Sequence, residues 1–264
     1  MSKIASKIIE PSRESGGAFI PYLMAGDPSP DRSLDYIRAL AAGGADLIEL
    51  GVPFSDPVAD GSAIQAAGKR ALESTNNLDE VFNLVRKVKE NVEIPVILMS
   101  YLNPIFQYGK PDFFEESGRT GVSGVILPDL PPEEGEDFLK VAKNYSVDVP
   151  LLATPATTEK RLARISEIAT GFLYLVARPG TTGAKNSVEE LTTKTIKKVK
   201  PQLPEKLPVC VGFGLSTPEQ VSRVISAGAD GAIVGSAIVE KVSNGEKPEA
   251  VERFVRDLKE ATKG

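Results

Sequence analysis

The chain has 264 residues, of which 41% are hydrophobic, and its formal net charge is -5. This length suits one large barrel or two small domains, and no composition change or Pro/Gly/Ser-rich linker divides it, so we expect one domain over residues 1–264. Lysine and arginine are scattered among acidic residues, which argues against nucleic-acid and membrane partners. The apolar runs are too short to span a bilayer and the polar first ten residues do not form a signal peptide, so we expect a cytoplasmic protein.

Missing residue types narrow the possible chemistry. The chain has no histidine and a single cysteine, Cys210. Without histidine there can be no Ser-His or Cys-His dyad, no imidazole base and no histidine-rich metal site. Cys210 lies in an apolar run, where we expect an inert core residue. Glycine-rich dinucleotide and P-loop motifs are also missing, so we expect acid-base chemistry by Asp, Glu, Tyr or Lys without a nucleotide or metal.

Eight short apolar runs recur along the chain, and most are followed by an amphipathic stretch of helical length. The expected strands are residues 19–24, 47–50, 96–99, 124–127, 149–152, 172–176, 209–212 and 231–234. The expected helices between and after them are residues 31–42, 79–91, 132–144, 159–168, 188–199, 218–227 and 248–263. This pattern predicts an α/β protein, a (β/α)8 TIM barrel with an extra N-terminal helix, and leaves a doubly wound open sheet as the alternative.

Two carboxylates lie on either side of the loop that follows the second expected strand. Glu49 lies inside the apolar run 47–50, where a carboxylate is costly to bury unless it is paired, protonated or used. Asp60 ends a loop broken by Gly and Pro, just before a helix expected to begin near Gly61. In such a barrel the active site lies at the C-terminal strand ends, and alternation places Leu47 and Glu49 on the inward face. The sequence therefore predicts two acids in different environments at the catalytic rim.

Glycine-rich turns follow the last three expected strands, at residues 178–183 and 212–217 and at Gly235-Ser236. Glycine lets backbone N–H groups approach an anion closely, and a helix beginning at Gly235-Ser236 would point its free amides into the barrel mouth. Any one of these segments could be only a tight turn. Because three occur in consecutive loops, we predict a phosphate slot and a phosphate-monoester substrate.

Five segments carry a resemblance to a known family: residues 21–28 (PYLMAGDP), 49–61 (ELGVPFSDPVADG), 128–131 (PDLP), 180–184 (GTTGA) and 212–214 (GFG). They are similar to the tryptophan synthase α-subunit family, and residues 49–61 are the most specific match. The resemblance covers essentially the whole chain. It implies cleavage of indole-3-glycerol phosphate to indole and glyceraldehyde 3-phosphate. It also implies transfer of indole to a β subunit in an α2β2 complex, with pyridoxal phosphate in the β subunit and no cofactor in this chain.

The family's two catalytic acids match Glu49 and Asp60. Retro-aldol cleavage needs a proton for indole C3, a base for the side-chain hydroxyl and a counter-charge for the indole nitrogen. We assign the proton transfers to Glu49 with a raised pKa, and acceptance of the indole N–H to Asp60 as an anion. A Schiff-base route is not expected, because no lysine lies in the expected strands.

The resemblance also implies a substrate site built from residues far apart in the sequence. The indole is expected among Tyr22, Ile64, Met99, Tyr101, Leu127, Tyr174 and Phe213; the phosphate among Gly183, Gly214, Gly235 and Ser236; and a closing lid near Arg178 and Thr182. The family's better-known members carry Phe at the position of Tyr22 and Ala at that of Pro128, a difference that bears on the shape of the pocket.

Two other interpretations stay open at this point. The chain could be a catalytically silent regulatory subunit, or another phosphate-binding barrel such as a phosphoribosyl isomerase or indole-3-glycerol phosphate synthase. The two acids favour an enzyme, and the rival barrels do not explain residues 49–61. We expect the loops at residues 53–60 and 103–105 to lie on one rim and to meet the β subunit.

Overall fold

The computed structural model describes residues 2–14, 16–176, 185–212 and 214–263. Within these residues eight parallel strands are assigned: β1 (Ala18–Met24), β2 (Ile48–Gly51), β3 (Val96–Met99), β4 (Val122–Ile126), β5 (Leu151–Ala153), β6 (Leu173–Val176), β7 (Val209–Gly212) and β8 (Gly231–Val234). They follow the order β4-β3-β2-β1-β8-β7-β6-β5. The ring closes between β4 and β5 through one parallel bridge from Gly124 to Asp148, where the Val125 N–H donates to the Asp148 carbonyl at 2.8 Å. The predicted (β/α)8 barrel is confirmed.

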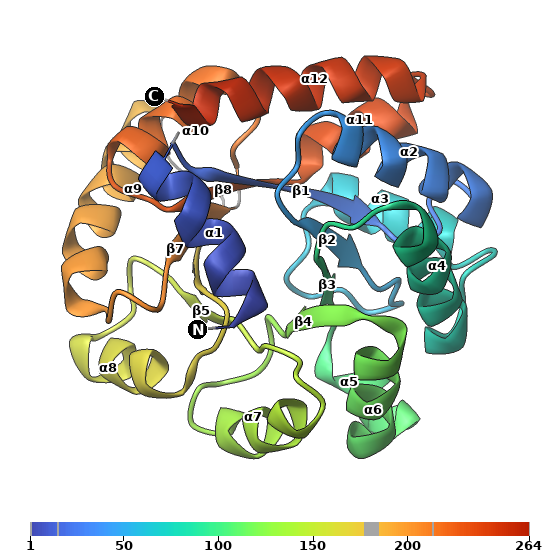
Figure 1. Cartoon of the computed structure of the whole chain (residues 1–264), viewed down its shortest axis with the longest axis horizontal. Coiled ribbons are helices and arrows are strands. Elements are labelled where there is room, and N and C mark those ends of the chain that lie inside the picture. Colours follow the sequence, from blue (N-terminus) through green and yellow to red (C-terminus); the bar gives the residue numbers. More distant parts are fainter. Residues whose placement is uncertain (1, 15, 177–184, 213, 264) are drawn as a thin grey trace.

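Helices surround this ring in the order expected for β/α units (Figure 1). They are α1 (Lys3–Glu14), α2 (Pro30–Ala42), α3 (Ser62–Ala71), α4 (Leu78–Asn91), α5 (Leu102–Tyr108), α6 (Lys110–Thr120), α7 (Gly135–Asn144), α8 (Glu159–Ile168), α9 (Lys185–Val199), α10 (Pro218–Ser226), α11 (Ser236–Ser243) and α12 (Pro248–Glu260). Two short 3-10 turns, Lys200–Gln202 and Ala261–Lys263, follow α9 and α12.

The expected extra N-terminal helix covers one end of the barrel. Figure 1 shows α1 in front of the strand ring. Its Ile4 and Ile8 are fully buried and pack with inward-facing strand residues such as Ile20, Ile97 and Ile126. This apolar plug fills the N-terminal end of the barrel among the described residues, so a ligand site is expected at the C-terminal strand ends.

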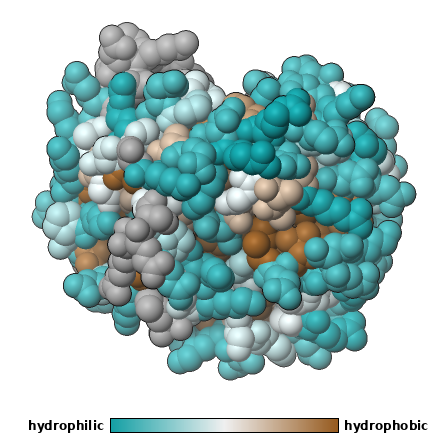
Figure 2. Space-filling model, turned by 45° about the horizontal axis from the view of Figure 1, so that its top comes forward, coloured by the Kyte–Doolittle hydropathy of each residue, from teal (hydrophilic) through white to brown (hydrophobic). Residues whose placement is uncertain are grey.

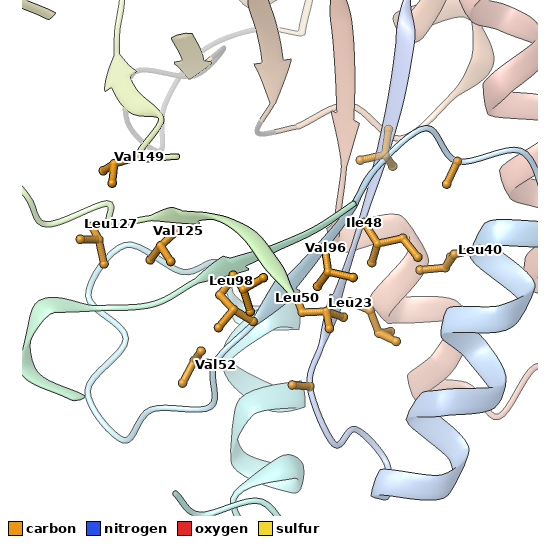
Figure 3. Packing of buried hydrophobic residues seen from close by; sticks show 14 of the residues in the cluster. Leu23, Leu40, Ile48, Leu50, Val52, Val96, Leu98, Val125, Leu127 and Val149 are labelled. Carbon is orange, nitrogen blue, oxygen red and sulfur yellow. The ribbon is translucent and has the colours of Figure 1, made fainter. Parts of the chain in front are cut away.

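Alternation along the strands separates two hydrophobic layers. Outward residues such as Leu23, Leu50 and Leu98 pack against the surrounding helices in a large buried cluster (Figure 3). Their strand neighbours, among them Glu49 and Ile97, point into the barrel instead. Each fully buried Leu or Ile contributes about 1.5–3 kcal/mol relative to an exposed side chain, so the register of each strand is strongly determined.

Several predicted element boundaries were wrong. The fifth strand is Leu151–Ala153 rather than residues 149–152, and the seventh helix begins at Gly135 rather than at residue 132. The pattern did not indicate α6. Residues 103–105, expected as a loop, lie within α5. The first N–H of that helix, at Leu102, donates to both carboxylate oxygens of Asp129 at 3.0 and 3.1 Å, a cap supplied by a distant loop.

The surface has few exposed hydrophobic side chains. Figure 2 shows hydrophilic residues covering most of one face, with hydrophobic residues visible in patches between them. In the described part of the chain the large hydrophobic side chains that are exposed are Val58 and Phe106. No helix among the described residues has the length and apolar character needed to cross a membrane.

Candidate active site

A cavity of about 470 Å³ lies at the C-terminal ends of the strands, between the beginnings of α3 and α11. Nine of the residues predicted from the sequence line it: Tyr22, Glu49, Asp60, Ile64, Met99, Tyr174, Gly214, Gly235 and Ser236. They come from β1, β2, β3 and β6 and from the segments that follow β2, β7 and β8. The barrel therefore brings together residues that are more than 200 positions apart in the chain.

Glu49 is the most deeply buried acid of the cavity. Its side chain is only 1% exposed, and its Oε2 atom has no hydrogen-bond partner among the described residues. Burial, with a smaller effect from the negative charge of Asp60, raises the pKa of Glu49 from 4.5 to about 8. At neutral pH the carboxyl group therefore keeps its proton while facing the cavity, as a general acid must.

Asp60 lies in a more polar environment. Partial burial raises its pKa above the ordinary value, and a hydrogen bond from the Tyr101 hydroxyl opposes this effect. The next residue, Gly61, is the N-cap of α3 and gives it no side-chain cap. The positive end of the α3 dipole thus lies beside Asp60 and favours its charged form. Two acids with different environments are therefore present, as predicted.

Tyr101 holds the loop that carries Asp60. Its hydroxyl accepts a hydrogen bond from the Ala59 N–H at 3.0 Å, and its ring packs on Phe54 with centroids 5.4 Å apart. It contacts Asp60 but does not line the cavity in this structure. Tyr101 thus connects the end of β3 to the loop after β2 and fixes the position of Asp60.

Tyr22 and Tyr174 form walls of the cavity. A Cβ atom on Gly51 would lie 1.9 Å from the Tyr22 hydroxyl, and one on Gly212 would lie 2.4 Å from the Tyr174 hydroxyl. Each tyrosine therefore needs a glycine at the end of the neighbouring strand. Burial raises the pKa of both phenols well above 10, so both are neutral at physiological pH and cannot act as bases.

The predicted phosphate end of the cavity is formed by Gly214, Gly235 and Ser236. Gly235 is the N-cap of α11 and supplies no side-chain cap, so the first amides of this helix are available to an anion. Gly214 has a φ of 93°, in the left-handed region that favours glycine. A larger residue at this position would be strained whether or not an anion binds.

Besides Tyr101, five predicted site residues are not among the described residues that line the cavity. Arg178, Thr182, Gly183 and Phe213 lie outside the described residues. Leu127 is not among the residues that line the cavity: it is buried in the outer cluster beside Val125 and Val149 (Figure 3). Strand alternation explains this placement, because Ile126 packs inside the barrel and the next residue must face the helices.

Other lining residues were not assigned to the site individually: Gly61, Ser62, Ala63, Leu215, Ser216, Ile233, Ala237 and Glu240. Of these, Leu215 and Ser216 lie in the glycine-rich turn at residues 212–217 that was predicted to bind phosphate. Helical spacing could have found Glu240, because it lies four residues after Ser236 on the same face of α11. The loop residues at 215 and 216 carried no distinguishing signal beyond the glycines beside them. Among the described residues, no group of three or more His, Cys, Asp or Glu side chains could hold a metal ion.

Comparison with known proteins agrees with this architecture. A family model described as tryptophan synthase alpha chain matches residues 9–263. The chain belongs to the tryptophan synthase alpha chain family. Among the curated relatives of the family, the protein of Methanosarcina acetivorans is 44% identical over 99% of this chain and 94% of its own length. That of Carboxydothermus hydrogenoformans is 45% identical over 92% and 90%.

Solved structures of family members have the same fold. The structure of the tryptophan synthase α2β2 complex of Pyrococcus furiosus superimposes with a TM-score of 0.86 at 36% identity, over 92% of this chain and 98% of that chain. The tryptophan synthase alpha chain of Legionella pneumophila gives a TM-score of 0.86 at 34% identity, over 99% and 97%. The likeness thus extends over nearly the whole chain and shows the same fold.

The raised pKa of Glu49 predicts a specific pH dependence of stability. Between pH 4.5 and about 8 the folded state keeps a proton that the unfolded state has released, so the free energy of unfolding falls as pH rises. The slope from this one group is at most about 1.4 kcal/mol per pH unit. Glu49→Gln removes the titration, so the variant should gain stability relative to the unmodified chain as pH rises from 5 to 8.

Urea unfolding at several pH values measures this difference. Glu205→Gln, an exposed acid at the other end of the barrel, is the matched control and should follow the unmodified chain at every pH. Parallel curves for Glu49→Gln and the unmodified chain would contradict a proton held on Glu49.

Proposed function

We propose that this chain acts as the α subunit of a tryptophan synthase, a lyase that cleaves indole-3-glycerol phosphate to indole and glyceraldehyde 3-phosphate. The indole passes to the β subunit, which uses it to make L-tryptophan. The observation that carries the proposal is the buried Glu49 facing the same cavity as Asp60 and the uncapped start of α11, with burial raising the pKa of Glu49 to about 8. The cavity, of about 470 Å³, is within the usual range for a small-molecule site.

The two acids supply the proton transfers that the cleavage requires. Glu49 donates its proton to indole C3, and the positive charge that develops on the ring nitrogen is balanced by Asp60, which accepts the N–H hydrogen bond. The Glu49 carboxylate then takes the proton of the adjacent side-chain hydroxyl. The carbon–carbon bond breaks, its electron pair returns to the indole ring, and an aldehyde forms as Glu49 regains its proton.

Three further parts of the proposal follow from family membership. No cofactor is required in this chain, because the proton transfers need only carboxyl groups, and pyridoxal phosphate is expected only in the β subunit. The chain works in the cytoplasm. Arg178, Thr182, Gly183 and Phe213, which lie outside the described residues, belong to the substrate site.

The first prediction concerns the two acids. Glu49→Gln removes the transferable proton and should lower kcat by about 10²-fold or more, while substrate still binds, because binding does not depend on that proton. Asp60→Asn keeps the size of the side chain but loses its charge, and a similarly large loss is expected. Glyceraldehyde 3-phosphate formation measures both. If the unmodified chain together with its β subunit produced no glyceraldehyde 3-phosphate, this result would favour the alternative interpretation as a catalytically silent regulatory subunit.

The second prediction concerns the phosphate slot. Ser236→Asp places a negative charge in the first turn of α11, where it suits the helix dipole but repels a bound anion. Inorganic phosphate should therefore bind at least about tenfold more weakly, a loss of about 1.4 kcal/mol. Ser236→Asn, of the same size and uncharged, is the matched control. Titration calorimetry with phosphate distinguishes the two, and equal affinities would exclude anion binding at this helix.

A rim beside the cavity has the properties of a docking surface for the β subunit. Val58 is 86% exposed in the loop that carries Asp60, and Phe106 is 59% exposed on α5, where its ring packs edge-on against Phe138. The loop that carries Asp60 contacts Tyr101 through the Ala59 N–H, and α5 follows Tyr101 directly in the chain. In the Pyrococcus furiosus relative, the α2β2 complex shows mutual activation. Docking on this rim would order the Asp60 loop and raise activity by a population shift.

The third prediction tests this coupling. Adding the cognate β subunit should raise the lyase rate of the isolated chain at least about tenfold, a coupling of roughly 1.4 kcal/mol. Phe106→Asp should weaken association and leave the rate of the isolated chain unchanged. Glu205→Gln, on the opposite end, should change neither the association nor the rate. If sedimentation shows the complex and the rate does not change, association without activation would refute the coupling.

A further inference from the structure

A charged cluster outside the cavity connects three of the segments that build it. Arg70, in the last turn of α3, donates from Nε to Oδ1 of Asp27 at 2.8 Å and from Nη2 to Oδ2 at 2.9 Å. The side chain of Asp27 is fully buried, whereas that of Arg70 is 35% exposed. This is a two-pronged pairing that only the planar guanidinium fork can make, so it fixes orientation as well as distance.

The same guanidinium reaches a third element. Nη2 of Arg70 also donates to the hydroxyl of Ser243, the last residue of α11, at 2.5 Å. Asp27 is itself held to the end of β1, because its N–H donates to the Met24 carbonyl at 3.3 Å. One side chain therefore joins α3, α11 and the end of β1.

Both helices begin at the cavity and end at Arg70. Ser62 and Ile64 of α3 and Ser236 of α11 line the cavity, while Arg70 and Ser243 lie in the last turns of these helices. With 10 and 8 residues, the helices are about 15 and 12 Å long. They contact each other along an apolar seam of Ala67, Ala71 and Val239.

Ile238 and Val242 of α11 are also buried in the outer cluster, so packing holds this helix against the barrel. The hydrogen bonds at the far ends of α3 and α11 are directional and add a restraint on displacement along the helix axes. A shift at those ends moves the first turns by the same distance, because a helix is rigid along its axis. The first turn of α3 follows Asp60, and that of α11 carries the predicted anion site.

We infer that Arg70 is a positioning residue, which sets the distance between Asp60 and the anion-binding start of α11 by holding the far ends of α3 and α11 to Asp27. The inference deepens the proposed function, on which it rests. The inference gives the two residues different roles. Arg70 positions both Asp60 and the anion site, at the two ends of the substrate, whereas Ser243 positions α11 alone.

The experiment compares Arg70→Lys and Ser243→Ala with a matched ion-pair variant, Lys200→Ala. Lys200 binds Asp230 at 2.7 Å at the N-terminal side of β7 and β8, away from the cavity. Lysine keeps the charge beside Asp27 but lacks the fork, and Ser243→Ala leaves the ion pair intact, so both variants should fold. The measurements are the affinity for inorganic phosphate by calorimetry, kcat and KM for indole-3-glycerol phosphate with β subunit present, and thermal unfolding.

Arg70→Lys should weaken phosphate binding and raise KM about fivefold or more, and should lower kcat about tenfold, since a displacement near 1 Å at reacting groups can cost up to about 10²-fold. Ser243→Ala should change phosphate affinity and KM with kcat nearly unchanged. Lys200→Ala should lower the unfolding temperature and change neither binding nor kcat.

Other results overturn the inference. If Arg70→Lys and Ser243→Ala bind phosphate as the unmodified chain does, Arg70 only stabilises the fold, and the proposed function stands as long as the unmodified protein cleaves the substrate. If the unmodified protein binds phosphate but cleaves nothing, the proposed function fails, and the phosphate affinities of the variants still decide the inference. An unmodified protein that binds no phosphate overturns both the slot and the role of Arg70.

Discussion

A strand in a closed parallel barrel must send alternate side chains inward, and the position of Glu49 depends on this constraint. Ile48 and Leu50 face the helices, so Glu49 faces the interior with Leu47 below it and Tyr22 opposite on β1. Shifting β2 by one residue would expose its apolar side chains to the wrong side of the sheet. The packing energy of the outer layer thus keeps an ionisable group in a place that would otherwise be unfavourable.

The interior of the barrel is divided along its axis as a result. Below Glu49, the residues of α1 and the inward strand positions form an apolar plug without access for water. Above it, the cavity is open at the strand ends and carries polar groups. Glu49 lies at the boundary between these layers, which explains why its pKa is raised to about 8 while it still faces the cavity. Asp60 enters from a loop instead and is stabilised by Tyr101.

The cavity therefore has a rigid side and an adjustable side. Glu49, Tyr22 and Tyr174 belong to strands with their register determined by the core. Asp60 and the start of α11 belong to segments outside the strand ring, and their positions depend on hydrogen bonds made by Tyr101 and Arg70. Such contacts cost less to rearrange than a packed core. The adjustable side includes the loop that carries both Asp60 and the exposed Val58.

Much of the site could be predicted because its signals are local. A carboxylate within an apolar strand, a glycine pair before a helix and the spacing of β/α units are all visible along the chain, and they correctly indicated the barrel and the burial of Glu49. Where prediction failed, the cause lay in contacts between distant segments. The cap of α5 comes from Asp129 in another loop, and the orientation of Leu127 depends on which face of β4 meets the helices.

The sequence by itself determined the alternation of apolar and polar residues, the glycines that permit close approach, and the absence of histidine. These properties belong to each residue and its immediate neighbours. Only the tertiary structure decided how far burial raises the pKa of Glu49, which hydroxyl supports Asp60, and that Arg70, Asp27 and Ser243 meet behind the cavity. The physical reason is that pKa values and hydrogen bonds depend on distances of a few ångströms between residues as many as 216 positions apart, and these distances are set by barrel closure and by the contacts between segments that it brings together.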